Sequence, residues 1–308
     1  MLFIKQFCTF APEKIVTHIN ITKNNMKKNA LCLVTIMMAT ILAAGLSSCD
    51  SDDVEDNGNG NSTKHVVRMI SKGKEYVEWL EDSVDESYYS EYTYDSRGRV
   101  TRMYDVDSSY HTYAYDRRYQ YGDNFILCEE ITESTYSTGE RKLDIERHKY
   151  TLENGLIVRD SITNSYKSGA VVDYYAYDDV KRLISKTREK NGKVLYRDDF
   201  VWEGNNLMEL INGDTKYSYS YSNNPWKSGM IISYSILEDG CLLDSGYFGM
   251  KPQYLPSTFE MNSETYKDEN FKDTYEYFLT DGLVTRIVGT HYDNNGLVKT
   301  SVMSVEWE

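Results

Sequence analysis

The sequence predicts an all-β protein: an antiparallel meander of β-hairpins that forms a large curved sheet, or an open or closed barrel, and is soluble in water. Alternation of side chains is the first sign, since Tyr217, Tyr219 and Tyr221 in "KYSYSYS" share one face at the period of a strand. Turn chemistry is the second, because pairs such as Asn154-Gly155 accept the positive φ angles of tight hairpins. Third, no long stretch after residue 64 shows the 3.6-residue period of a helix.

The N-terminal part reads as a leader. In residues 26–48, Lys27 and Lys28 give a positive start, an apolar run follows, and small residues stand directly before Cys49. This pattern is that of a lipoprotein signal peptide, with Cys49 as the lipidation site. The alternative is a plain transmembrane anchor, for which the run is close to the lower length limit, but the small residues favour cleavage. Residues 1–25 resemble neither a leader nor a domain and are expected to be an artefact of start-site choice.

Residues 49–64 are rich in acids, Gly and Asn, and are expected to form a flexible, self-repelling tether. An acidic run directly behind a lipidated cysteine resembles the surface-export signal of Bacteroidota lipoproteins. The resemblance implies an outer-membrane, surface-exposed protein that contacts the membrane only through its N-terminal lipid. In enteric-type bacteria an Asp directly after the lipidated cysteine would instead indicate retention at the inner membrane. The formal net charge is −14, and removal of the lysine-rich leader makes the chain more acidic. Nucleic acid is therefore excluded as a partner.

Residues 65–308 read as a single domain of repeated hairpins. Each unit is an aromatic run, a turn and an apolar pair, as in "YTYDSRGRVTRMYD" and "YFLTDGLVTRI". Adjacent residues of a strand face opposite sides of a sheet, so the apolar pair covers both faces near each strand start. Such coverage favours a sheet that curls into a barrel over a flat sheet with one wet face.

One segment interrupts the hairpins. "GYFGMKPQYLPSTF", residues 246–259, holds two prolines and two glycines and is expected to be a crossing loop that packs Tyr247, Phe248 and Tyr254. Together with the leader, the tether and the hairpin units, this segment resembles an uncharacterised family of Bacteroidota lipoproteins, described as a domain of unknown function with a porin-like fold. The hairpin units also resemble the YD repeats of Rhs-type β-shells. The resemblance covers residues 65–308 and implies a fold and a location, but no catalytic residues.

A membrane-spanning barrel is not expected. Its lipid-facing positions would have to form an unbroken apolar band. In "RKLDIERHKY" one face is polar throughout, and the other ends in Arg147 and Lys149. The porin-like fold is therefore expected to be a shape that stands in water.

The sequence offers little sign of catalysis. Ser71-Lys72-Gly73-Lys74 has the spacing of penicillin-recognising enzymes, which instead place the serine at a helix start. Residues 105–116 lack the Gly and Glu of a calcium loop. No cofactor, metal or enzymatic activity is predicted, and an enzyme acting on surface glycans through a carboxylate pair remains an alternative. The histidines, which lack metal-ligand spacing and are expected to be solvated, are His65, His111, His148 and His291.

Two cysteines remain behind Cys49. A disulfide between Cys128 and Cys241 is one possibility in an exported protein. Two separate, half-buried thiols are the other, and are favoured because two cysteines make no disulfide framework.

The tyrosine rows are the feature with the widest functional reach. Tyr217, Tyr219, Tyr221 and the nearby Trp226 are a candidate platform for sugar rings. The alternative is a ladder of cross-strand aromatic pairs that stiffens the sheet, which is favoured because tyrosines recur in nearly every hairpin. The predicted function is accordingly a binding or structural module of the envelope, with a glycan or an envelope protein as its partner.

Two short motifs are candidate modification sites. "DSV" around Ser83 and "DSI" around Ser161 resemble the three-residue O-glycosylation signal of exported Bacteroidota proteins. A pattern this short also arises by chance.

Overall fold

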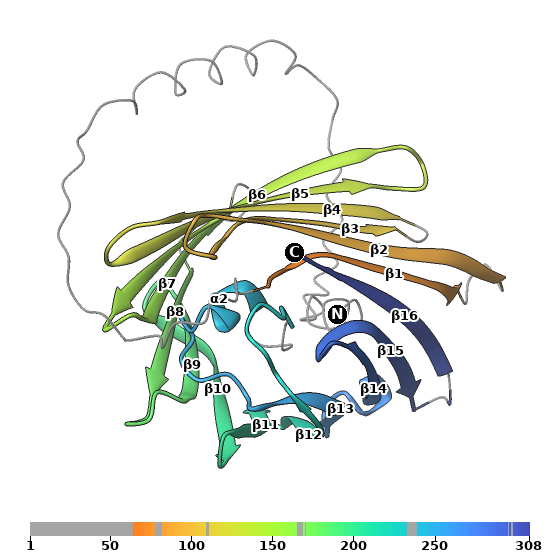
Figure 1. Cartoon of the computed structure of the whole chain (residues 1–308). Helices are drawn as coiled ribbons and strands as arrows, with labels where there is room; N and C mark the ends of the chain where they lie inside the picture. Colours follow the sequence, from red (N-terminus) through yellow and green to blue (C-terminus); the bar gives the residue numbers. More distant parts are fainter. Residues whose placement is uncertain are drawn as a thin grey trace, which may run out of the picture. The chain divides into compact units, whose positions relative to one another are not determined.

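The computed structural model describes residues 64–77, 82–108, 111–164, 169, 171–232, 239–294, 296 and 298–308. These residues form sixteen β-strands, one α-helix and one 3-10 helix (Figure 1). The elements are β1 (Val66–Val77), β2 (Asp82–Tyr94), β3 (Val100–Ser108), β4 (Thr112–Tyr121), β5 (Phe125–Thr135), β6 (Arg141–Glu153), β7 (Leu156–Asn164), β8 (Val171–Tyr177), β9 (Leu183–Lys190), β10 (Lys193–Glu203), β11 (Asn206–Asn212), β12 (Thr215–Pro225), α2 (Gly240–Asp244), β13 (Tyr254–Ser263), η2 (Lys267–Glu269), β14 (Phe271–Thr280), β15 (Leu283–Asp293) and β16 (Val298–Trp307).

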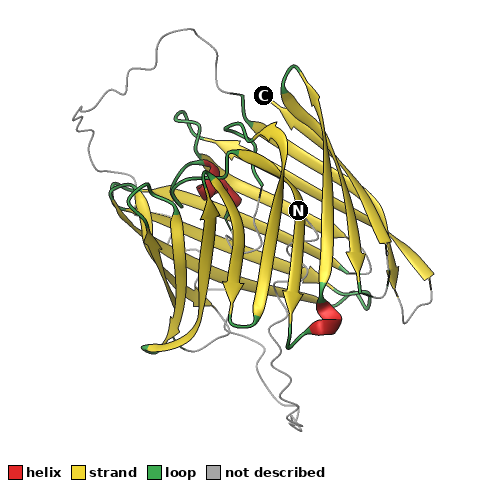
Figure 2. Cartoon of the chain, turned by 90° about the horizontal axis from the view of Figure 1, so that it is seen from below, coloured by secondary structure: helices red, strands yellow, loops and turns green. Residues whose placement is uncertain are grey.

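The strands make one closed antiparallel barrel. Every strand pairs with its neighbours in the sequence, and the ring closes where β1 pairs with β16, with Ile70 opposite Ser304. The predicted all-β hairpin meander is therefore confirmed, and of the open and closed alternatives the barrel is closed. Figure 2 shows the strands side on, with α2 among the loops at one end and η2 at the other.

Tight turns connect the strands where Asn or Asp precedes Gly. Asn154 and Gly155 have φ angles of 51° and 79°, and Asp281 and Gly282 have 52° and 75°. Two successive positive φ angles match the right-handed twist of the flanking strands, and these residue types adopt them at low cost. The dipeptides quoted from the sequence thus set both the place and the geometry of these hairpins.

A repeated hydrogen bond explains why the hairpin units carry aromatic residues. Near one end of the barrel, a tyrosine or tryptophan close to the end of each of seven strands donates to a backbone carbonyl at the same end, over 2.5 to 2.8 Å. Only tyrosine and tryptophan combine a large apolar ring with such a donor. The bonded pairs are Tyr94–Val66, Tyr121–Val100, Tyr177–Ile157, Trp202–Leu183, Tyr221–Leu207, Tyr277–Pro256 and Trp307–Val284.

Register shifts beside the same turns explain the apolar pairs. The pairing slips by one residue between Ala176 and Tyr177 and at the corresponding place in several other hairpins. In these hairpins the shift places one member of the apolar pair inside: Leu183 is 2% exposed, while its neighbour Ile184 is 40% exposed on the outer wall. One member of the pair therefore covers the inner face near the strand start, and the other member lies on the outer face.

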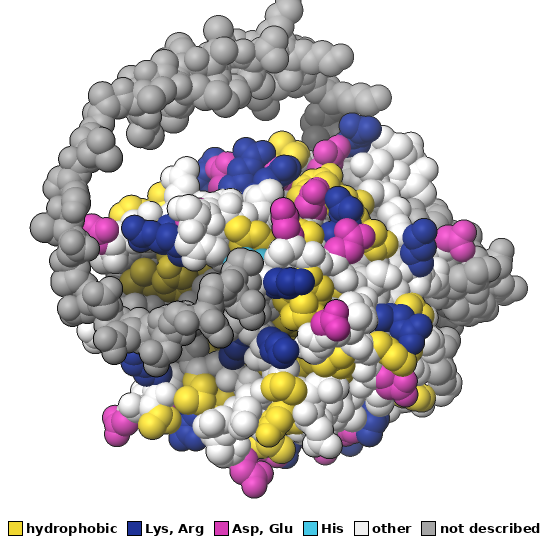
Figure 3. Space-filling model, in the orientation of Figure 1, with side chains coloured by type: hydrophobic (Ala, Val, Ile, Leu, Met, Phe, Trp, Pro, Cys, Tyr) yellow, Lys and Arg dark blue, Asp and Glu magenta, His cyan; other side chains and the backbone are white. Residues whose placement is uncertain are grey.

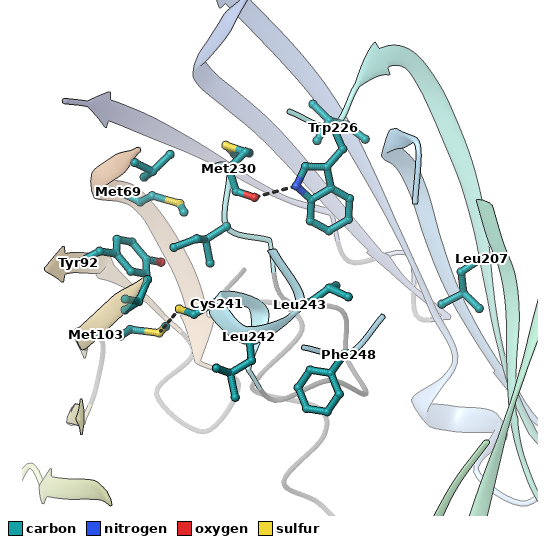
Figure 4. Packing of buried hydrophobic residues seen from close by; sticks show 14 of the residues in the cluster. Met69, Tyr92, Met103, Leu207, Trp226, Met230, Cys241, Leu242, Leu243 and Phe248 are labelled. Carbon is teal, nitrogen blue, oxygen red and sulfur yellow. Dashed lines mark hydrogen bonds between the residues drawn. The ribbon is translucent and has the colours of Figure 1, made fainter. Parts of the chain in front are cut away.

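Residues 226–232 and 239–253, here called the plug, fold into the barrel at the end that carries these turns. The plug contributes Trp226, Met230, Leu242 and Phe248 to the buried core, where the Trp226 indole donates to the Met230 carbonyl over 2.7 Å (Figure 4). Backbone hydrogen bonds tie it to the rim, among them Met250 N–H to the Lys181 carbonyl at 2.8 Å. This end, the plugged end, is therefore closed by the chain itself.

Gly249 shows how close the plug lies to the rim. Its φ is +79°, and a Cβ at this position would overlap the carbonyl oxygen of Lys181. Only glycine fits such an approach.

No helix among the described residues is long and apolar enough to cross a membrane.

The expected crossing loop at 246–259 is only partly correct. Residues 246–253 belong to the plug, but Tyr254 begins β13, and Pro256 lies inside that strand. Pro256 is tolerated because the register against β12 shifts there and because β13 pairs with β14 only from Thr258 onward.

The outer wall of the barrel is charged. Arg102 bonds Asp116 over 2.7 Å, and Arg147 bonds Glu129 over 2.8 Å, both between neighbouring strands. Figure 3 shows basic, acidic and apolar side chains interspersed over the visible face. Exposed apolar residues such as Leu143 and Val302 lie among these charges and leave no unbroken apolar band on the described wall.

Candidate functional site: the polar lumen

The inward-facing side chains of the barrel are unusually polar. A sixteen-stranded barrel is wide enough to leave an aqueous interior, here called the lumen. The inner face of β6 carries Asp144, Glu146 and His148, while Leu143 and Ile145 point outward. Buried charged or polar residues of the lumen are Glu86, Asp105, Arg117, His148, Asp160, Asp173, Lys186, Asp198, Asp273 and His291.

The two ends of the lumen differ in their access to water. At the plugged end Leu242 and Ile157 are fully buried. The opposite end, here called the mouth, carries the turn Asn191–Gly192 and helix η2. Inward-facing side chains of the mouth half are partly exposed, at 34% for Glu146 and 21% for Arg188. Water therefore reaches the lumen from the mouth and is excluded at the plugged end.

Asp239 anchors the plug to the wall. Its carboxylate accepts the hydroxyls of Tyr119, at 2.5 Å, and Tyr150, and lies 3.9 Å from the Arg117 guanidinium. Burial, reinforced by the Asp239 charge, raises the pKa of both tyrosines well above its usual value, so they stay donors at any physiological pH. Arg117 is held in turn by Glu130.

His148 lies between two carboxylates. Its Nδ1 is 2.7 Å from Asp160 and its Nε2 is 3.2 Å from Glu146. Burial alone would lower the pKa of His148, but hydrogen bonds to Asp160 and Glu146 outweigh it and raise that pKa well above the ordinary value. The hydrogen bond from His148 lowers the pKa of Glu146. The imidazolium is thus an internal counter-ion for the acids of β6 and β7.

A second ion cluster lies on β8 and β9. Arg188 binds Asp173 through two 2.7 Å hydrogen bonds, and Lys186 lies 3.3 Å from the same carboxylate. Although burial opposes ionisation, these cations lower the pKa of Asp173. Asp273 and His291 form a similar buried pair at 2.7 Å on β14 and β15.

Near the mouth the wall offers donors, acceptors and aromatic rings together. Asn164 donates to Asp144 over 3.3 Å and to Glu146 over 3.2 Å, and Asn212 donates to Asp198 over 2.6 Å. The half-buried rings of this region are Tyr115, Tyr196 and Tyr217.

The expectation of solvated histidines is wrong for two of the four. His148 and His291 are 7% and 4% exposed, because the lumen supplies each with a carboxylate. Among the described residues no group of three or more His, Cys, Asp or Glu is arranged to hold a metal ion.

The aromatic row points into the lumen. Tyr219 and Trp226 are 4% and 5% exposed. Tyr217 stacks on Phe259 with ring centroids 5.7 Å apart, and Tyr221 makes one of the repeated hydrogen bonds to backbone. This placement favours the aromatic ladder over an exposed sugar platform, and glycan binding by the row stays an untested hypothesis.

Replacing Tyr219 with Ala is expected to cost stability. The ring packs on Phe259 at 5.1 Å, so its loss should reduce the free energy of unfolding by about 1 to 3 kcal/mol. Thermal unfolding and binding to a glycan panel measure the two roles separately. Ser220→Ala, on the exposed outer face of the same strand, is the control. A variant of normal stability that loses a glycan interaction of the natural protein would establish the platform instead.

The two cysteines are free thiols in separate surroundings. Both are buried, and the Cys241 thiol donates to the Met103 sulfur over 3.7 Å (Figure 4). The disulfide alternative is therefore wrong. The expected half-burial is also exceeded, at 3% and 1% exposure for Cys128 and Cys241, and burial raises the pKa of both thiols.

The predicted modification sites are placed only in part. Cys49 lies outside the described residues. Ser83 belongs to β2, and Ser161 lies at an outward-facing position of β7 between the inward Asp160 and Ile162. Their glycosylation stays a prediction.

The chain matches no protein-family model and no curated protein. The resemblance to a lipoprotein family thus stays a prediction. Among solved structures the chain is similar to a porin-like protein from Bacteroides vulgatus ATCC 8482. The two are 12% identical, the match covers 80% of this chain and 99% of that one, and the TM-score is 0.37.

Proposed function

We propose that this chain is a lipid-anchored protein of the outer-membrane surface and that its barrel is a binding module with a blind lumen. The observation that carries the proposal is the contrast between the two ends: a plug bonded to the rim closes one, and water reaches polar side chains at the other. A conduit would need both ends open. A polar cavity with one entrance is instead suited to holding a ligand.

The charged outer wall supports a barrel that stands in water. Ion pairs such as Arg147–Glu129 contribute little stability at a surface, but the same charges facing lipid would be costly. The proposal therefore assigns contact with the membrane to the lipid on Cys49 alone.

A contact between the residue before β1 and the residue after β16 supports a defined orientation. His65 and Glu308 bond each other at the plugged end, through two backbone hydrogen bonds of 2.9 and 3.0 Å. A tether of residues 49–64 would hold this end toward the membrane, with the mouth facing the medium.

A non-enzymatic role is part of the proposal. The buried acids that an enzyme would use are engaged with cations: Asp173 with Arg188 and Lys186, and Asp160 with His148. These contacts account for the perturbed pKa of Asp173 without a catalytic task.

Changing Cys49 to Ala tests the anchor. The variant should keep its leader and incorporate no labelled fatty acid, because the thiol that is acylated is missing. Cys128→Ala, which removes a buried thiol of the barrel, is the matched control and should label normally. Normal labelling of the Cys49 variant would reject the assignment.

A further inference from the structure

The mouth of the lumen has mixed hydrogen-bonding chemistry on several strands. Asn164 and Asn212 are donors, Asp144 and Glu146 are acceptors, and Arg188 lies 5.4 Å from the ring centre of Tyr196. A ligand rich in hydroxyl groups needs donors and acceptors together, because each hydroxyl both gives and accepts a hydrogen bond.

Aromatic faces accompany the polar groups. Tyr115 and Tyr196 lie on inward positions of β4 and β10, and burial raises the pKa of each to about 12, so both rings stay neutral. Neutral tyrosine offers an apolar face and a polar rim, which suits a sugar ring with its C–H face and its hydroxyl edge.

The charge of the lumen limits the class of ligand that it can bind. On the described inner wall acids outnumber bases. The acids are Glu86, Asp105, Glu130, Asp144, Glu146, Asp160, Asp173, Asp198 and Asp273, and the bases are Arg117, the His148 imidazolium, Lys186, Arg188 and Lys299. The excess negative charge of the inner wall repels carboxylated, sulfated or phosphorylated ligands.

We infer that the mouth of the lumen binds the end of an uncharged oligosaccharide. The plug leaves no exit, so a chain enters by one terminus and cannot thread through. This inference rests on the proposed binding role. It adds the ligand class, the site and the mode of entry.

A pair of tryptophan variants tests the site. Thr132 faces the lumen beside Tyr115, and its neighbour Ile131 faces outward. In the detergent-solubilised full-length lipoprotein, binding is measured to uncharged hexasaccharides of glucose, mannose, xylose and galactose. Thr132→Trp should weaken the binding of any bound hexasaccharide at least tenfold, while Ile131→Trp should change it less than twofold. Melting temperatures show that both variants are folded.

A second pair keeps the test decisive if a variant fails to fold. Thr215 lies inward on β12 and bonds Ser263 over 3.0 Å, and Lys216 beside it is exposed. Thr215→Trp and Lys216→Trp should repeat the same contrast. A hexasaccharide linked to albumin at both ends should not bind, whereas the same sugar linked at one end should.

Three outcomes would overturn the inference. They are no binding to any uncharged hexasaccharide, equal losses in the inward and outward variants, and binding of hexalysine in place of sugar, which would mean that the acid excess selects a cationic ligand. Each is distinguishable from failure of the anchor, because lipid labelling of Cys49 is read out independently.

Discussion

Asp239→Ala is expected to reduce the free energy of unfolding by about 3 to 5 kcal/mol. The side chain is 4% exposed and accepts hydroxyls from two wall strands beside the Arg117 guanidinium. Its removal leaves two buried hydroxyls and part of a buried positive charge uncompensated, and such losses are among the costliest single changes in a protein interior.

Chemical denaturation measures the loss in the free energy of unfolding, and amide hydrogen exchange shows which part of the barrel is destabilised. Exchange at the amides of Ile157 and Met250 should quicken first, since Ile157 N–H donates to the Tyr247 carbonyl of the plug and Met250 N–H donates to the Lys181 carbonyl of the rim. Asp239→Asn retains one acceptor and should lie between the natural protein and Asp239→Ala. Asp179→Ala, at an exposed rim position, is the matched control and should change stability by less than about 0.5 kcal/mol. A loss of that small size for Asp239→Ala would mean that the plug is held by its apolar contacts alone.

His148 is expected to make stability fall as pH rises. Its pKa is raised well above the value of about 6.5 that histidine has in an unfolded chain, so the folded protein holds an extra proton above that pH. The contribution is complete below about pH 6.5 and is lost as pH climbs toward the folded pKa. Over that window one such group lowers the free energy of unfolding by about 1.4 kcal/mol per pH unit.

The double variant His148→Gln/Asp160→Asn is the comparison that isolates this effect. It keeps hydrogen-bonding groups of similar size and removes the ionisable pair, whose atoms are 2.7 Å apart. Urea unfolding between pH 7 and 8.5 should show the natural protein losing stability with a slope steeper by about 1.4 kcal/mol per unit. Equal slopes would show that His148 is neutral in the folded state.

The hairpins of this chain can be predicted from its sequence. The closure of the barrel, and which face of each strand points inward, cannot. Asn154-Gly155 predicts a hairpin because its backbone conformation is a property of two residues. Closure depends on β1 meeting β16 across the whole length of the domain, and no local pattern encodes that meeting.

The site was missed for a related reason. The polar row Asp144, Glu146 and His148 alternates with Leu143 and Ile145, and polarity alone makes the polar row the outer one. A barrel of this width reverses the assignment, because its interior is wide enough to hold water and ion pairs. The usable signal is the pairing of acids with histidine or arginine on one face of adjacent strands, as in Asp160 with His148 and Asp173 opposite Arg188.

The closure of the barrel at its first and last strands has a mechanical consequence. Any pull transmitted through residues ahead of His65 acts on the start of β1 and runs largely along that strand, which is held by β2 on one side and β16 on the other. The load is then shared by both ladders of hydrogen bonds in shear and does not peel them apart one at a time. A barrel held through these residues would in this way be strained where its strands are bonded on both sides, and the lumen at its far end would keep its form.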